Sequence, residues 1–266
     1  VFRDADASGT RADSKVAPTV APTKSLQNHC MITSLVVYPV KSLGGMEVRE
    51  WPLGARGLLL DREWALVGDA DGAVLSLRDQ PRLAAIHARV RLADKADLSG
   101  LSGELVLSHR LCGELEEIRV PFGAGESGSD HSDLLPPAGL QAWLAAAVGL
   151  PCSLVRFGAG EDSKRAAGAW HAQVERHRKG TAAAGGLCTP QAPPRVAFAN
   201  EAQLLVVSAA SVADLNARVV ALGGGGVVGD ADRPMDAQDF RPNVVIDGGG
   251  LAPWSEEAWA GAAVGQ

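Results

Sequence analysis

An arginine and an asparagine stand two positions apart in DFRPNVVIDGGG, residues 239–250, directly before an apolar run. The proline between them fixes its own φ angle and disfavours the helical region for Arg241. We therefore expect an extended backbone from which Arg241 and Asn243 project to the same side. A guanidinium beside an amide suits a ligand with a phosphate or oxo group next to a hydrogen-bonding heterocycle. From this motif alone, two residues that close a turn are an equal alternative, and Asp239 is given no role.

A second candidate is the loop YPVKSLGG, residues 38–45, which follows a run of β-branched residues. Lys41, Ser42 and the backbone amides next to the two glycines can converge on an anion, as in many phosphate-binding loops. The spacing differs from that of a P-loop, which needs GxxxxGK followed by Ser or Thr. For this segment alone, an ordinary loop with a solvated lysine is the more common outcome.

Two further segments carry arginines between apolar residues. In GLLLDREWALV, residues 57–67, Asp61 and Arg62 are enclosed by apolar runs, and such a pair is more often a structural ion pair. The alternative is an Arg62 that binds a phosphate or carboxylate through two parallel hydrogen bonds. In LRDQPRL, residues 77–83, Arg78 and Arg82 flank a proline-stiffened turn, and a surface position is favoured for both.

Other patterns of catalysis or metal binding are weak. The sequence contains no GxSxG motif and no GxGxxG before a helix, and no residue is indicated as a nucleophile with a base beside it. His171 and His177 do not have the i, i+4 spacing of a helical zinc pair. The scattered cysteines form no CxxC pair, which indicates reduced thiols rather than a zinc site or a disulfide framework. These cysteines are Cys30, Cys112, Cys152 and Cys188.

The composition is that of a soluble globular protein, with 266 residues of which 46% are hydrophobic and 21% charged. The 25 Lys and Arg against 31 Asp and Glu give a net charge of -6, which argues against a sequence-independent nucleic-acid binder. No apolar run approaches the roughly 18 residues of a membrane span, and the N-terminus lacks the layout of a signal peptide. We therefore expect a cytoplasmic protein that binds neither nucleic acid nor a membrane.

Short strands must position these side chains. Strand-like runs occur at 32–38, 46–51, 64–69, 73–78, 86–92, 104–108 and 118–122, with Asp71-Gly72 as a hairpin signal. A helix fits residues 138–149, ended by Gly149, with SLVRF as its strand partner. A strand at 203–207, a helix at about 209–222 capped by Ser208, and a turn at SEEAW follow. This pattern predicts a mainly β protein with a few helices, in the α+β class, with a compact barrel or sandwich.

Two segments divide the chain. Residues 1–30 have almost no large apolar side chains and are predicted to be a disordered linker. Residues 158–195 are rich in Ala, Gly and Pro and are predicted to be a flexible connection. We therefore expect one domain at 31–157 and another at 196–266. The first residue is Val rather than Met, which favours a piece of a longer protein.

Five motifs occur in an order that resembles a known family: YPVKSLGG, GLLLDREWALV, LRDQPRL, NEAQLLVVSAAS and FRPNVVIDG. They resemble the C-terminal MOSC region of eukaryotic molybdenum cofactor sulfurases with its preceding N-terminal β-barrel domain. The resemblance implies a MOSC N-terminal β-barrel domain at 31–157 and a partial, C-terminally truncated MOSC β-barrel domain at 196–266. It also implies that the ligand is molybdenum cofactor, a pterin with a dithiolene and a phosphate. Matched to the related amidoxime-reducing MOSC proteins, the cofactor-lining positions fall on Lys41, Ser42, Arg62, Arg241 and Asn243.

The resemblance also implies an activity. In the sulfurases, an upstream domain with pyridoxal phosphate (PLP) takes sulfur from cysteine as a persulfide. The MOSC part holds the cofactor while that sulfur replaces an oxo ligand on molybdenum, and xanthine dehydrogenase and aldehyde oxidase are the clients. The sequence has no counterpart of the PLP domain, so we expect only the cofactor-binding part here. The family's distinctive cysteine is expected beyond residue 266, and no catalytic residue is assigned.

Two alternatives remain open at this point. One is an amidoxime-reductase-like MOSC oxidoreductase, which would use the cofactor for electron transfer at a membrane. The other is a non-catalytic carrier that stores or hands over the cofactor. The residues NEAQ at 200–203 and GLLLDREW at 57–64 are more similar to the sulfurases than to the reductases.

Overall fold

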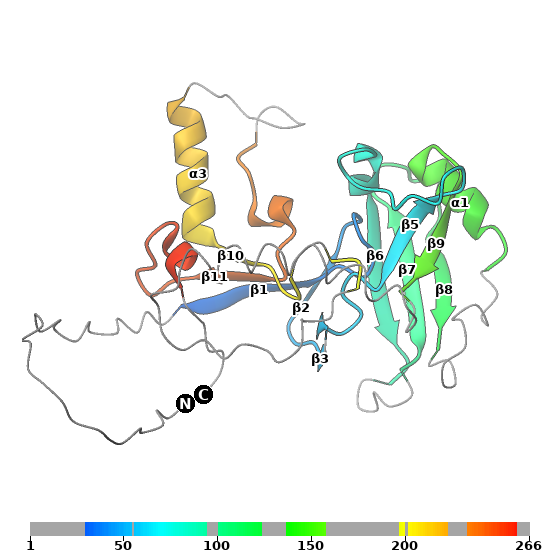
Figure 1. The fold of residues 1–266 in the computed structure, drawn as a ribbon, viewed down its shortest axis with the longest axis horizontal. Helices are drawn as coiled ribbons and strands as arrows, with labels where there is room; N and C mark the ends of the chain where they lie inside the picture. The colour runs from blue at the N-terminus through cyan, green and yellow to red at the C-terminus, as the bar shows by residue number, and fades with distance from the viewer. Residues whose placement is uncertain are drawn as a thin grey trace, which may run out of the picture.

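A computed structural model describes residues 30–54, 56–94, 101–123, 137–157, 197–199, 202–222 and 233–259. Within these ranges the protein consists mostly of strands with two α-helices, so the predicted class, mainly β with a few helices, is confirmed. The described strands form open sheets that do not close into a barrel. Figure 1 shows two groups of elements, one around α3 and β11 and the other around α1 and β7.

The group around β7 contains the larger core. The strands β6 (Ile86–Leu92), β7 (Gly103–His109) and β8 (Ile118–Phe122) form an antiparallel sheet, and β5 (Trp64–Gly68) pairs antiparallel with β9 (Cys152–Arg156). The helix α1 (Leu140–Val148) and the 3-10 helix η1 (Pro81–Ala85) pack against them. Alternation along β6 buries Ile86, Ala88 and Val90, as its period of two predicts. The strands predicted at 86–92, 104–108 and 118–122 and the helix ended by Gly149 are confirmed.

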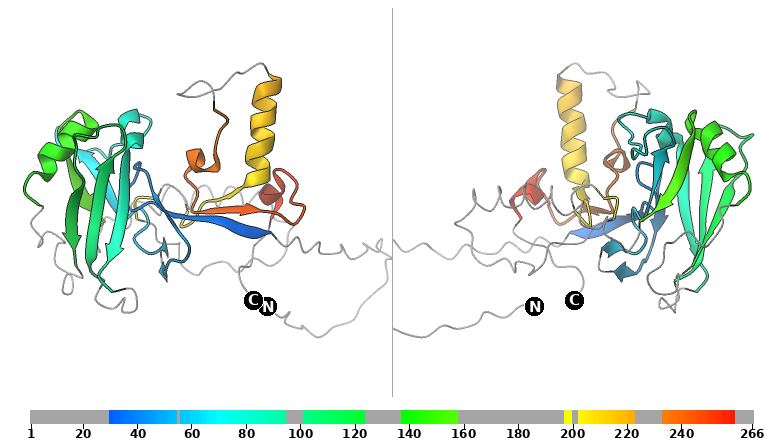
Figure 2. Two further views of the ribbon diagram at one scale, coloured as in Figure 1. Left: turned by 180° about the vertical axis from the view of Figure 1, so that it is seen from behind. Right: turned by 45° about the vertical axis from the view of Figure 1, so that its right-hand side comes forward.

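The group around β11 is a four-stranded sheet in the order β10-β11-β1-β2. Its central pair joins β1 (Met31–Val37) antiparallel to β11 (Val244–Asp247), while β10 (Val206–Ser208) runs parallel to β11. The edge strand β2 (Met46–Val48) pairs with β1. The helix α3 (Ala209–Ala221) follows β10 directly, as the views in Figure 2 also show. This sheet therefore joins residues from both expected domains.

Short elements complete the described chain. The strands β3 (Leu53–Gly54) and β4 (Gly57–Leu58) form a two-stranded hairpin. The 3-10 helix η2 (Ala237–Phe240) precedes β11, and η3 (Ser255–Ala258) lies at the predicted SEEAW turn. The predicted linker 1–30, apart from residue 30, and nearly all of the connection 158–195 lie outside the described residues. The predicted domain boundaries stay predictions.

Three local predictions are wrong or too long. Residues 73–78 do not form a strand: only Val74 bridges to Val67, because Ser76 starts a turn in which its hydroxyl donates to Asp79. Such local side-chain bonds compete with strand pairing. The strands predicted at 46–51 and 203–207 are shorter in the structure, at Met46–Val48 and Val206–Ser208. Ser208 is the N-cap residue of α3 as predicted, but its side chain makes no capping hydrogen bond.

Candidate functional site

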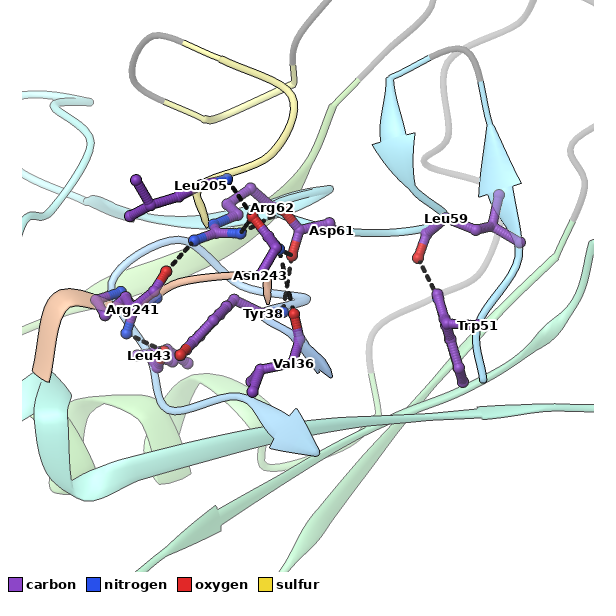
Figure 3. A network of polar contacts seen from close by, with 10 residues as sticks. All are labelled: Val36, Tyr38, Leu43, Trp51, Leu59, Asp61, Arg62, Leu205, Arg241 and Asn243. Carbon is purple, nitrogen blue, oxygen red and sulfur yellow. Dashed lines mark hydrogen bonds and ion pairs between the residues drawn. The ribbon is translucent and has the colours of Figure 1, made fainter. Parts of the chain in front are cut away.

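Asn243 lies directly before β11 at the centre of a polar network (Figure 3). It is 2% exposed. Its amide oxygen accepts hydrogen bonds from Arg62 Nη1 (2.9 Å) and the Leu205 amide (3.1 Å). Its amide nitrogen donates to the Val36 carbonyl (3.2 Å) and to Asp61 Oδ1 (3.0 Å). Every hydrogen-bonding site of this side chain is therefore used within the protein.

Asp61 and Arg62 form the ion pair that was the favoured interpretation of their sequence, with 2.5 Å between Arg62 Nη1 and Asp61 Oδ2. Asp61 Oδ1 also accepts from the Tyr38 amide at 2.8 Å. Burial raises the pKa of the Asp61 carboxyl, while Arg62 and these hydrogen bonds act in the opposite direction. Arg62 Nη2 donates to the carbonyl of Arg241 at 2.9 Å. The pair thus connects the turn after β4 to the residues just before β11.

Arg241 does not have the extended backbone that its position before a proline predicts. Its φ angle is 56°, in the left-handed region, where it ends η2. Two hydrogen bonds hold this conformation, one from the Arg241 amide to the Gln238 carbonyl (2.9 Å) and the other from Arg62 to the Arg241 carbonyl. Arg241 and Asn243 are therefore not related as neighbours on one face of a strand. The prediction was wrong because a side chain from a distant part of the sequence fixes this turn.

Asp239 helps to form that turn, although sequence analysis gave it no role. Its carboxylate accepts from the Asp236 amide at 2.8 Å, and Asp236 in turn caps the Gln238 amide at 2.8 Å, which makes a capping box. Arg233 donates to both carboxylate oxygens of Asp239, at 2.7 and 2.9 Å. The spacing of the two aspartates was the signal that could have found this cap.

Two guanidinium groups lie over one aromatic ring. The Cζ atoms of Arg62 and Arg241 are each 4.5 Å from the centroid of the Tyr38 ring. Both distances are within the cation-π range. Tyr38 begins the YPVKSLGG loop, and no role was predicted for it from the sequence. The signal available was that it is the single tyrosine of the chain and begins this loop.

The predicted anion loop lies against the same cluster. The side chain of Arg241 donates through Nη1 to the carbonyl of Leu43, and Ser42 Oγ donates to the Leu75 carbonyl at 3.4 Å. Ser42 is 8% exposed and has a φ angle of 68°. Lys41 is partly buried, and this burial lowers its pKa. The structure thus places the loop of Lys41 and Ser42 beside Arg62, Arg241 and Asn243.

The electrostatics of this cluster favour an anion. Burial, with a further contribution from nearby Arg62, lowers the pKa of Arg241 to about 10. Asp61 forms its ion pair with Arg62, and within the described ranges no carboxylate pairs with Arg241. A partly desolvated guanidinium without a paired anion can bind a phosphate or carboxylate with charge-assisted hydrogen bonds.

The other arginines of interest lie elsewhere. Arg78 and Arg82 are both exposed, as predicted, and the guanidinium of Arg82 lies against Gly149 at the end of α1. A hollow of about 770 Å³ beside η1 and α1 is lined by Arg82, Arg110 and Cys112, among others. Its two arginines are exposed, so water already solvates their charges. The hollow shares no lining residue with the cluster formed by Tyr38, Arg62, Arg241, Asn243 and the loop of Lys41 and Ser42.

The described residues contain no group of three or more His, Cys, Asp or Glu side chains placed to hold a metal ion. None of their helices is long and apolar enough to cross a membrane. His171, His177 and Cys188 lie outside the described residues.

Two families match the chain. Residues 29–111 match the MOSC N-terminal beta barrel domain, and residues 193–266 match the MOSC domain. The chain is 32% identical over 249 residues to a protein of Oryza sativa subsp. japonica named molybdenum cofactor sulfurase, and 30% identical over 247 residues to that of Arabidopsis thaliana. It is 25% identical over 252 residues to the human protein of that name. The alignments cover 88% of this chain but only 24 to 26% of these relatives, so the chain spans about a quarter of their length.

Proposed function

Because the chain carries a MOSC N-terminal domain and a MOSC domain, it belongs to the MOSC family, and we propose that it binds molybdenum cofactor. Its similarity to proteins that are named molybdenum cofactor sulfurases supports this proposal. The proposed site is the cluster around Tyr38. Its residues are those predicted from the sequence, namely Lys41, Ser42, Arg62, Arg241 and Asn243.

One observation carries the proposal. The guanidinium of Arg241 is a partly buried cation whose described contacts are the carbonyl oxygen of Leu43 and the aromatic ring of Tyr38. Burial is the main cause of the lowered pKa of its guanidinium, as expected for a cation that is removed from water without a directly paired anion. A phosphate fits such a position, because its oxygens accept the remaining N–H donors and its charge offsets the desolvation. Lys41, on the adjacent loop, brings a second desolvated cation to the same region.

The five residues divide into two groups by their contacts. Arg241, Lys41 and Ser42 are proposed to contact the cofactor phosphate and the neighbouring polar groups. The guanidinium of Arg62 makes three hydrogen bonds to protein atoms and the amide of Asn243 is fully used, so both are proposed chiefly to hold Arg241 in place. When bound, the cofactor would supply a molybdenum centre that accepts sulfur.

The wider activity is proposed from the relatives. We propose that the chain holds the cofactor while sulfur arrives from a PLP-dependent cysteine desulfurase domain outside these residues, with xanthine dehydrogenase and aldehyde oxidase as the enzymes served. The relatives reported above are named as sulfurases, which favours this function over an amidoxime-reductase-like oxidoreductase. A cofactor carrier would share the same binding site.

The binding proposal is tested by Arg241→Ala. Loss of one charge-assisted phosphate contact costs about 1.5 to 3 kcal/mol, or roughly a 10- to 150-fold weaker affinity. The measurement is a fluorescence titration with a synthetic pterin that carries a phosphate monoester, compared with the same pterin without phosphate. Arg91→Ala is the matched control, because Arg91 is an exposed arginine on β6. Equal affinity in Arg241→Ala and the parent protein would exclude this site.

A further inference from the structure

Tyr38 occupies the middle of the proposed site but has no assigned role. Its side chain is almost fully buried, with 3% of the residue exposed. Its hydroxyl is also buried and has no hydrogen-bond partner among the described residues. Its backbone, in contrast, is firmly held, since its amide donates to Asp61 and its carbonyl accepts from the Arg62 amide at 2.7 Å. The ring is therefore fixed in place, while its hydroxyl adds no described hydrogen bond.

The two arginines on this ring are held in different ways. The guanidinium of Arg62 has three hydrogen bonds, to Asp61, Asn243 and the Arg241 carbonyl. The guanidinium of Arg241 has one, to the Leu43 carbonyl, and no ion pair among the residues described. A flexible arginine side chain with a single neutral hydrogen bond would gain hydration by turning toward water. The face of the Tyr38 ring is the remaining described contact that opposes this movement.

Repulsion from Arg62 makes this contact more important. The two guanidiniums lie at the same distance, 4.5 Å, from one ring, and Asp61 compensates Arg62 directly. Arg241 therefore experiences a neighbouring positive charge, which contributes to its lowered pKa. The negative face of an aromatic ring attracts a cation without adding a formal charge. It can hold Arg241 while leaving that arginine's charge available to an anion, whereas a carboxylate would neutralise it.

We infer that Tyr38 is a positioning residue of the anion site, whose ring holds the Arg241 guanidinium where a bound phosphate can meet it. This inference rests on the proposed function, because it assumes that Arg241 binds the anion. It assigns the effect to the aromatic face and not to the hydroxyl. It also states that Tyr38 acts through Arg241, so the two residues must be coupled in binding.

Two substitutions separate the ring from the hydroxyl. Tyr38→Phe keeps the ring and removes no described hydrogen bond, so affinity for the phosphorylated pterin is expected to stay within about 2-fold of the parent. Tyr38→Leu removes the aromatic face and is expected to weaken binding by roughly 3- to 30-fold, the range for a partly desolvated cation-π contact. Parent-like affinity in a folded Tyr38→Leu protein would overturn the inference. So would an equal loss in both variants, because the hydroxyl would then be responsible.

A double-mutant cycle tests whether the effect passes through Arg241. In an Arg241→Met background, Tyr38→Leu is expected to change affinity by less than about 2-fold, since the cation that the ring holds is gone. A merely structural role of Tyr38 would weaken binding in both backgrounds by the same factor, and that result would overturn the inference. The affinities are measured by the same titration, with Arg91→Met as the charge-matched control.

The single tyrosine allows a direct test of the contact without ligand. In protein labelled with ring-¹³C tyrosine, the NMR spectrum contains the ring signals of Tyr38 alone. Arg241→Met is expected to shift these signals and Arg91→Met to leave them unchanged. Inorganic phosphate is expected to shift them in the parent protein but not in Arg241→Met. If Tyr38→Leu does not fold, the NMR result decides: Tyr38 ring signals that are unchanged in Arg241→Met would overturn the inference.

The outcomes separate the two proposals. If the parent binds the phosphorylated pterin and Arg241→Met weakens it, the proposed site stands, and the Tyr38 variants then decide the inference alone. If the parent and Arg241→Met bind equally well, the proposed site fails and the inference fails with it.

Discussion

Every donor and acceptor of the Asn243 amide is used within the protein, and its partners come from three separate segments. These are the end of β1, the Asp61–Arg62 turn and Leu205, directly before β10. The backbone of Asn243 adds hydrogen bonds to Leu205 and Val36, each of 2.8 Å. A residue that sequence analysis assigned to ligand recognition is thus better suited to holding the site together.

Asn243→Ala is therefore expected to destabilise the fold. The substitution leaves Asp61, Arg62 and two backbone groups with unmet hydrogen bonds in a buried position, which costs about 3 kcal/mol or more. Asn216→Ala is the matched control, because the partly buried Asn216 amide makes two hydrogen bonds to the Met235 backbone. Denaturant unfolding gives the comparison. A smaller loss in Asn243→Ala than in Asn216→Ala would contradict the role assigned to Asn243.

At the level of elements, the turn η2 sets the position of Arg241. The left-handed conformation at its end orients the side chain toward Leu43, and the Asp236 and Asp239 cap stabilises the turn. Hydrogen bonds from Arg233, together with the Asp236 amide, hold the pKa of Asp239 below its usual range. A carboxyl with a lowered folded-state pKa stabilises the fold above its unfolded pKa. That contribution is lost as the pH falls through the folded-state value.

Asp239→Asn is expected to lower the free energy of unfolding by about 1 kcal/mol at pH 6 to 7. The difference from the parent protein should begin to shrink below about pH 4, the usual aspartate pKa, and should be lost once the pH has fallen through the lower folded-state pKa of Asp239. Chemical denaturation at a series of pH values measures both the difference in unfolding free energy at pH 6 to 7 and its decrease toward acid pH. Asp71→Asn, at an exposed turn residue, is a control for the loss of one negative charge. A difference that grows toward acid pH would contradict the assignment.

Elements that follow from a local pattern of residues can be predicted from the sequence, whereas a turn held by a side chain from a distant segment cannot. The strand β6 and the helix α1 follow from periodic apolar residues, and the structure confirms both. The conformation of Arg241 could not be found this way, because Arg62, far away in the sequence, holds its carbonyl. The same limit applies to Tyr38, whose neighbours are two arginines from different segments. The sequence therefore predicted which residues lie in the cluster, but not which of them hold the site together and which are available to contact a ligand.

For the whole molecule, the pairing of β1 with β11 has the largest consequence. It joins residues that the sequence assigns to two domains, and it brings Tyr38 and Arg62 from the first beside Arg241 and Asn243 from the second. The chain carries a net charge of -6, yet this junction brings the guanidiniums of Arg62 and Arg241 to one aromatic ring, and Asp61 forms its ion pair with Arg62. Such a local reversal of charge in a partly desolvated place concentrates the field on an anion.

Ligand binding at this junction should therefore stabilise both halves of the chain together. At a phosphorylated pterin concentration of about 100 times Kd, binding adds about 2.7 kcal/mol to the stability of the folded state. Hydrogen exchange measured by mass spectrometry is expected to slow in peptides that contain residues 36–44 and 58–64 and equally in those that contain 203–208 and 240–246. The ligand should slow exchange less in Arg241→Ala, because its weaker affinity leaves less of the variant bound at the same ligand concentration. Protection confined to one half would contradict a site shared between them. The side chains and the carbonyl that hold Arg241 belong to Arg62, Tyr38 and Leu43, which all come from the first half.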